Sequence, residues 1–320
     1  MLTSLLTHAQ ALDLPSSLPP AYPSKPIRVI VGITTGGGLD MMVRLAAKTL
    51  SEHWSVPVIV DNRPGGGTLI AMDLVAQAPN DGYTFLGASE TLMLNGVLKR
   101  TTLDVRQAFI PVVQLTTQPY VLVINPALAI NTVRELIAYC KAHPMQLSYG
   151  SQGMGTTGHI SWERFNRMSG IQTTHVPYKG TASALIDVLA GHIQMTFSTI
   201  SDIEQNIKAG KLRALALTGT HRFETLPQLP TIAESGVPGF ESHNTYGYLA
   251  PARTPLSIVD ATNKIIREKI NKPAIKKSIL DGGSEVVPPA TAQAFKAKFA
   301  LEYDALDHLI QGMKINFRPE

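Results

Sequence analysis

The chain has 320 residues, 44% of them hydrophobic, and a formal net charge of +4 at pH 7. A chain of this length buries one large core or two medium ones, so two α/β domains are expected. The Lys and Arg residues are scattered and do not alternate with aromatic residues, so nucleic acid is not an expected partner. The single cysteine, Cys140, excludes an intrachain disulfide, and the nine histidines form no HxxxH pair. We therefore expect neither a metal site nor a cofactor.

Residues 1–20 have features of a secretory signal. They contain an apolar patch followed by Ala9, Gln10 and Ala11, but the basic region in front is missing and the apolar core is short. We interpret this segment as a partial signal peptide, with a disordered leader as the alternative. No later stretch approaches the roughly 20 apolar residues that span a bilayer.

The clearest functional pattern lies between residues 27 and 50, IRVIVGITTGGGLDMMVRLAAKTL. A β-branched run predicts a buried strand, and apolar residues at helical spacing predict a helix, with Gly36, Gly37 and Gly38 at the junction. Because the first N–H groups of a helix lack intrahelical partners, we expect this turn to hold a carboxylate or phosphate. A tight turn without a ligand is the alternative. Asp40 either contacts a cationic group of the ligand or favours the first helical turn through the helix dipole.

Strand and helix patterns alternate from residue 27 to about 310, which predicts βαβ units and a mostly parallel sheet. Further strands are expected near 58–60, 83–87, 120–124, 147–150, 174–176, 193–197 and 212–217. Gly-rich junctions at 36–38 and 65–67, and at 150–158 and 178–180, are expected on two sheets that face each other across a cleft. From about residue 255 the chain returns to helices around a short strand at 285–287. We place these helices on the first domain, with crossings near 118–120 and 245–248.

Residues 151–159, SQGMGTTGH, contain a GxGxxG pattern. A dinucleotide site is disfavoured, because no acidic residue lies between Glu163 and Asp187 to hold a ribose. The backbone N–H groups, with hydroxyls from Ser151, Thr156 and Thr157, suit an oxygen anion better.

A hydrolase is a rival hypothesis that uses Ser151 or Ser183 with His159 or His175 and Asp187. No GxSxG motif supports it. We expect a capping or packing role for His159 and a core position for His175. Lys179 either supplies a charge to a bound anion or is a solvated surface lysine.

Several segments resemble, in their order along the chain, the Bug family, the TctC-type periplasmic receptors of tripartite tricarboxylate transporters. These include VDNRPGGG, LSYGSQGMGTTGH, THVPYKG, LPTIAESGVPG and YGYLAPARTP, and the resemblance runs from about Tyr22 to about Met313. It implies an α/β fold of the periplasmic binding protein type (type II, Venus flytrap), with two α/β domains joined by crossing strands. Domain 1 would comprise residues 21–119 and 247–320, and domain 2 residues 120–246.

The resemblance also implies a ligand site, carried over position by position. In domain 1 the implied ligand-binding residues are Ile33, Thr34, Thr35, Gly36, Gly37, Gly38, Asp40, Ala88, Ser89 and Asn95. In domain 2 they are Ser151, Gly153, Gly155, Thr156, His159, Lys179, Gly180, Thr181, Ser198, Ser201 and Asp202.

The chain departs from the family pattern at this site. Family members usually carry a phenylalanine, a small residue and a proline at the positions of Ile33, Thr34 and Thr35. They often have Asp-Asn at the positions of Ser198 and Thr199. The identity of the ligand is therefore not transferable from a relative.

The expected function is that of a monomeric, non-enzymatic periplasmic receptor, secreted through its signal peptide. It would capture a small carboxylate and deliver it to the membrane subunits of a tripartite transporter. One alternative is a receptor of the same fold that presents its ligand to a sensor kinase. The other is the hydrolase with Ser151 and His159.

Overall fold

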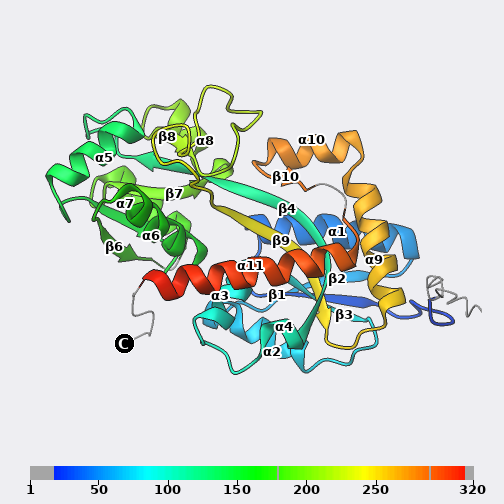
Figure 1. Ribbon diagram of the computed structural model, residues 1–320. Coiled ribbons are helices and arrows are strands. Elements are labelled where there is room, and N and C mark those ends of the chain that lie inside the picture. The colour runs from blue at the N-terminus through cyan, green and yellow to red at the C-terminus, as the bar shows by residue number, and fades with distance from the viewer. Residues whose placement is uncertain (1–17, 179, 288–289, 314–320) are drawn as a thin grey trace, which may run out of the picture.

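The computed structural model of the chain describes residues 18–178, 180–287 and 290–313, with the side chains of 290–312 in the last range. It is an α/β molecule with two lobes (Figure 1). Most of the segment predicted as a signal peptide or leader lies outside the described residues.

The strands form one ten-stranded sheet whose main path is β2-β1-β3-β9-β4-β7-β5-β6. β8 and β10 pair with β4 off this path. The strands are β1 (Ile27–Val31), β2 (Val58–Asn62), β3 (Thr84–Ser89), β4 (Phe109–Ile124), β5 (Ser148–Ser151), β6 (Thr174–Pro177), β7 (Met195–Thr199), β8 (Arg213–Leu217), β9 (His243–Pro251) and β10 (Glu285–Val286). The strands expected from the sequence are confirmed, with shifted ends.

The prediction of a mostly parallel sheet is wrong for its centre. β1 runs parallel to β2 and β3, and β5 runs parallel to β6 and β7. However, β4 is antiparallel to β7, β8 and β9, and β9 is also antiparallel to β3. They are antiparallel because the chain leaves one lobe along β4 and returns to it along β9.

The long strand β4 belongs to both lobes. Its residues Phe109–Pro119 pair with β9, and from Tyr120 it pairs with β7. This change of partner coincides with the crossing predicted near 118–120. Figure 1 shows β4 and β9 running together between the lobes.

Helices cover both faces of the sheet. They are α1 (Gly38–Trp54), α2 (Leu69–Ala76), α3 (Thr91–Val97), α4 (Val105–Ala108), α5 (Val133–Ala142), α6 (Thr157–Ser169), α7 (Thr181–Ala190), α8 (Ile200–Lys208), α9 (Leu256–Ile270), α10 (Pro273–Asp281) and α11 (Ala292–Met313), with a short 3-10 turn at Gly66–Thr68. In α1 the residues Leu39, Val43, Ala46 and Leu50 are buried, which is the helical spacing that the sequence shows.

The buried hydrophobic residues divide between the lobes. Two clusters draw on residues 27–115 and 246–306, together with Ile160. Two others draw on residues 120–240. Each lobe therefore has its own core, as expected of units of this size.

The last helix, α11, reaches further than the sequence predicted. Phe299 and Leu306 of α11 share a hydrophobic cluster with Ile160 of α6, which belongs to the other lobe. The sequence placed this helix on the first domain alone. Its length carries it along the crossing strands to the second lobe (Figure 1). Within the described residues, no helix combines the length and apolarity needed to cross a membrane.

Candidate functional site

The triple-glycine turn stands at the carboxyl end of β1 and starts α1. Gly37 is the N-cap residue, in an extended conformation with φ of −74°, and no side chain of the described residues caps the helix there. Met41 N–H donates to Gly37 O at 3.0 Å, which is the first helical bond. The start of α1 thus presents backbone N–H groups that no side chain occupies, as an anion site requires.

Asp40 forms its hydrogen bonds with other groups of the protein. Its carboxylate accepts hydrogen bonds from Gly36 N–H at 3.0 Å, Arg44 Nε at 2.9 Å and Asn62 Nδ2 at 2.9 Å. Burial alone would raise the pKa of Asp40, but these donors outweigh it and hold the pKa below its ordinary value. Asp40 thus pairs with Arg44 of its own helix. Contact of Asp40 with a cationic group of a ligand stays a prediction, as does its effect through the helix dipole. Arg44 lies one helical turn along α1, so the spacing alone would have identified it.

Two threonines precede the glycines and are exposed. Thr35 Oγ1 donates to Asn62 Oδ1 at 3.3 Å, and Asn62 Nδ2 also holds Ile33 O at 3.0 Å. Asn62, which ends β2, therefore fixes the turn from the neighbouring strand. A ligand contact with Thr34 stays a prediction.

The remaining predicted residues of the first lobe lie on β3 and α3. Ala88 and Ser89 end β3, where they pair with β9. Asn95 is fully buried, and its Nδ2 donates to Gly67 O at 2.8 Å and to Thr68 Oγ1 at 3.2 Å. Asn95 thus holds the second Gly-rich turn in place.

In the second lobe, the predicted residues of the β5–α6 turn come together. Ser151 Oγ accepts from Gly153 N–H at 3.1 Å, and Thr156 Oγ1 donates to Gly153 O at 2.7 Å. Thr156 is the N-cap of α6, and no described side chain caps that helix. Gly153 and Gly155 have φ of 128° and 66°, which favour glycine.

Two stacked histidines pack against this turn. Gly155 N–H donates to His159 Nδ1 at 2.9 Å, and the ring of His159 stacks on that of His175 at 3.9 Å. Burial lowers the pKa of His159 to about 3 and that of His175 to about 4, so both are neutral near pH 7. His159 therefore packs within the turn and holds Gly155, the residue that precedes the N-cap of α6.

The hydrolase constellation is assembled only in part. Of the two histidines named for it, His175 contacts Ser151 Oγ, with Nε2 at 2.7 Å. Asp187 instead bonds Tyr178 Oη at 2.6 Å and His192 Nδ1 at 3.2 Å. The acid of a triad is thus engaged elsewhere.

The other two junctions of the second lobe also start helices without a side-chain cap among the described residues. Gly180 is the N-cap of α7, whose Thr181 Oγ1 accepts from Gln152 Nε2 at 3.0 Å. Lys179 lies outside the described residues. Thr199 is the N-cap of α8, and its hydroxyl contacts Ser201 Oγ and donates to Asp202 Oδ2 at 2.8 Å. Ser198 is fully buried in β7.

The crossing strands bring the two lobes together at a tyrosine that the sequence did not indicate. Tyr246 Oη donates to Gln118 Oε1 at 2.7 Å, and it lies 2.9 Å from where a Cβ of Gly38 would stand. Burial, and next the charge of Asp202 at the start of α8, raise the pKa of Tyr246 above its ordinary value. The start of α1 thus packs against a hydroxyl group of the crossing strand β9.

A second contact between the lobes joins Arg100 to the β5–α6 turn. Arg100 Nη2 donates to Met154 O at 2.7 Å, and a side chain on Gly155 would collide with the guanidinium group. Only glycine fits at position 155 for this reason as well as for its positive φ. No local sequence pattern indicates this contact, because the partners are 54 residues apart.

Comparison with known proteins identifies the family. The sequence profile of the tripartite tricarboxylate transporter family receptors matches residues 42–313. The chain belongs to this receptor family. It is 34% identical over 302 residues to a protein encoded in the tcbD-tcbE intergenic region of Pseudomonas sp., covering 93% of this chain and 88% of that protein. It is also 32% identical over 269 residues to BugT of Bordetella pertussis, covering 83% and 82% of the two chains.

Solved structures agree with this assignment. A protein of R. palustris determined with adipate superposes with a TM-score of 0.83 at 33% identity, covering 91% of this chain and 98% of that one. The periplasmic binding protein BugD superposes with a TM-score of 0.80 at 28% identity, with the same coverages. The predicted Bug-type family and the binding-protein fold are therefore confirmed, and the family is one of periplasmic solute-binding receptors.

Proposed function

We propose that this receptor captures a small organic dicarboxylate between its two lobes and delivers it to the membrane subunits of a tripartite transporter. One carboxylate would lie at the start of α1, at residues 36–38. The other would lie at the starts of α6, α7 and α8. Residues 21–119 with 247–320 and residues 120–246 would close on the ligand as two domains.

The observation that carries this proposal is the position of four helix starts at the ends of strands. α1 follows the carboxyl end of β1, and α6, α7 and α8 follow the carboxyl ends of β5, β6 and β7, of which β5 runs parallel to the other two. No described side chain caps α1, α6, α7 or α8. A helix start carries a partial positive charge and unpaired N–H groups, so a carboxylate binds there without a cationic side chain.

The relatives support the class of ligand. The R. palustris protein, 33% identical, was determined with adipate. Charge-assisted hydrogen bonds contribute about 1.5–3 kcal/mol each, so four to six of them around a dicarboxylate suffice for micromolar affinity despite the ordering cost. Export to the periplasm through a signal peptide is part of the proposal, because BugD is a periplasmic binding protein.

A substitution at the start of α1 tests the carboxylate site. Asp is a better N-cap than Gly, so Gly37→Asp is expected to leave the free energy of unfolding unchanged or to raise it by a few tenths of a kcal/mol. Its carboxylate would occupy the N–H groups and repel the ligand. Adipate affinity, measured by isothermal titration calorimetry, should therefore fall about tenfold or more.

Gly37→Ala is the matched control, because it adds only a Cβ that would lie 3.1 Å from the flexible tip of Ile33. It should bind adipate close to wild-type affinity. The proposal fails if no dicarboxylate from four to eight carbons raises the melting temperature of the wild type, or if Gly37→Asp binds adipate as tightly as Gly37→Ala.

A further inference from the structure

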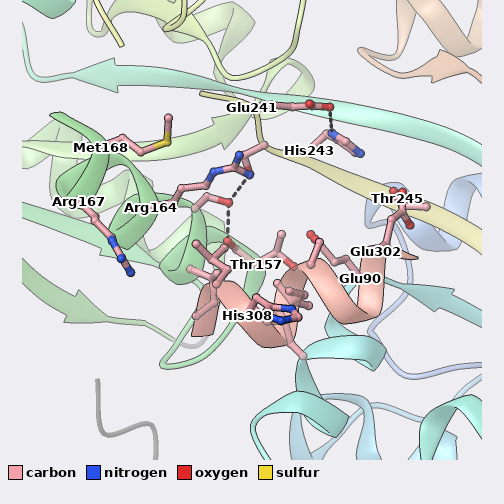
Figure 2. A pocket seen from close by; sticks show the side chains of 17 residues that line it. Glu90, Thr157, Arg164, Arg167, Met168, Glu241, His243, Thr245, Glu302 and His308 are labelled. Atoms are coloured by element: carbon pink, nitrogen blue, oxygen red, sulfur yellow. Dashed lines mark hydrogen bonds and ion pairs between the residues drawn. The ribbon is translucent and has the colours of Figure 1, made fainter. Parts of the chain in front are cut away.

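A cavity of about 660 Å³ lies apart from the turns described above. It is enclosed by α6 of one lobe, by α11 and the start of α3 of the other, and by the first residues of β9 (Figure 2). Thr157, the first residue of α6, lines it, while the other described residues predicted to bind an anion do not. A volume of this size is typical of small-molecule sites.

Two side chains that line the cavity have buried acceptor atoms without a partner. Glu302 Oε2 is buried and has no hydrogen-bond partner within the part of the chain that the structure describes, while its Oε1 lies 3.5 Å from Lys298 Nζ. Thr157 is 5% exposed, and its Oγ1 is likewise buried without a partner among the described residues. A buried oxygen without a partner costs free energy, which a donor from a bound molecule would recover.

Glu90 adds a second carboxyl group to the cavity. Burial raises the pKa of Glu90 to about 7, with Glu302 adding to the rise and His243 and Arg164 opposing it. Figure 2 shows the side chains of Glu90 and Glu302 directed into the same part of the cavity. Two carboxyl groups in the same part of a cavity favour a cation near them.

The other walls differ in character. Leu94, Ile160 and Leu306 present apolar surface. Arg164 reaches in from α6, with its guanidinium group 5.9 Å from the ring centroid of Phe240 (Figure 2). The cavity therefore combines an acidic end, an apolar middle and a guanidinium group.

We propose that this cavity binds a small zwitterion, an amino carboxylate with an apolar chain. Its ammonium group lies between Glu90 and Glu302, its chain lies against the apolar wall, and its carboxylate faces Arg164. The hydroxyl group of Thr157 accepts a further hydrogen bond from the ammonium group. Because the cavity is formed by α6 and α11 together, the zwitterion bridges the two lobes.

A pair of molecules of equal length tests this proposal by calorimetry. 6-Aminohexanoate is the zwitterion, and adipate replaces its ammonium group with a carboxylate. The wild type is expected to bind both, and Gly37→Asp should lose adipate while it retains 6-aminohexanoate. The adipate measurements therefore test the dicarboxylate receptor function separately from the cavity.

Two variants locate the zwitterion. Glu302→Gln removes the charge, and Thr157→Val removes a hydroxyl group that has no partner among the described residues, so the second variant is expected to fold normally. Each should weaken 6-aminohexanoate binding about tenfold or more, and Glu302→Gln should leave adipate binding unchanged. Glu224→Gln makes the matched change of carboxylate to amide on an exposed loop, and should alter neither affinity.

Two results would overturn the proposal. One is that the folded wild type does not bind 6-aminohexanoate. The other is that its affinity is the same in Glu302→Gln, Thr157→Val and Glu224→Gln, while Gly37→Asp abolishes it, which would place the zwitterion in the carboxylate cleft.

Discussion

At the scale of single residues, Asp40 organises the turn that starts α1. It is 1% exposed and accepts hydrogen bonds from a backbone N–H, a guanidinium group and an amide. These donors would lose a buried partner without it. The residue therefore stabilises the glycine turn in the conformation in which no described side chain caps the first N–H groups of α1.

The first prediction concerns Asp40→Asn. The substitution removes the charge and sets an amide N–H₂ group against donors, so the free energy of unfolding at pH 7 should fall by about 1–3 kcal/mol. Because the folded-state pKa of Asp40 lies below its unfolded value of 3.8, the stabilisation is fully present above that value. It is lost as the pH falls through the lowered folded pKa.

Urea unfolding of the wild type and the variant at several pH values measures both effects. Asp73→Asn, on an exposed position of α2, is the matched control. An equal loss of stability in the two variants would argue against the role given to Asp40.

At the scale of elements, the β5–α6 turn rests on a column of aromatic rings. Trp162 stacks on Tyr149 at 4.6 Å, Tyr149 on His175 at 4.9 Å, and His175 on His159 at 3.9 Å. His159, the last ring of the column, accepts a hydrogen bond from Gly155 N–H through its unprotonated Nδ1. The turn therefore depends on neutral histidines.

The second prediction concerns pH. The folded-state pKa of His159, about 3, lies below its unfolded value of 6.5, so protons bind preferentially to the unfolded chain. Stability is retained above that unfolded value and decreases as the pH falls toward the folded pKa. Burial is the largest cause of the lowered pKa of His159, and the neighbouring His175 and Arg100 lower it further.

His159→Asn keeps an acceptor near the Nδ1 position but does not titrate. Between pH 7 and pH 5 this variant should lose about 2 kcal/mol less stability than the wild type. Urea unfolding at the two pH values gives the difference. If the wild type and the variant lose the same amount of stability, His159 is protonated in the folded protein, which contradicts its neutral state in the ring column.

At the scale of the whole molecule, the lobes are joined by β4, β9 and α11, and by polar contacts between their surfaces. Arg100 donates to Met154 O, and His221 Nε2 lies 3.0 Å from Glu285 Oε1. Contacts that exist only when the lobes approach favour the closed arrangement, and a ligand between the lobes is stabilised by the same arrangement.

The third prediction concerns Arg100→Met. The loss of this contact should increase the radius of gyration of the ligand-free protein in small-angle X-ray scattering. It should also weaken adipate binding about three- to tenfold. Arg106→Met serves as the control, because Arg106 pairs with Asp304 within one lobe. Unchanged scattering and affinity in Arg100→Met would show that the contact does not influence closure.

Much of the local structure could be predicted from the sequence, and the type of site that the glycine turn forms stays a prediction. The β-branched run at 27–31, the helical spacing of 39–50 and the glycines between them predict a strand, a helix and an anion turn, because periodicity and backbone freedom are local properties. The same holds for the β5–α6 turn. The order of such motifs along the chain was enough to identify the family.

The tertiary structure decided which groups meet. Three contacts join segments far apart in the chain: those of Tyr246 with Gly38, of Arg100 with Met154 and of α11 with α6. No local pattern encodes such contacts. In the structure, Asp40 pairs with Arg44, and His159 accepts a hydrogen bond from Gly155 N–H. Whether a polar side chain serves a ligand or its own backbone depends on the partners that folding brings within hydrogen-bond distance.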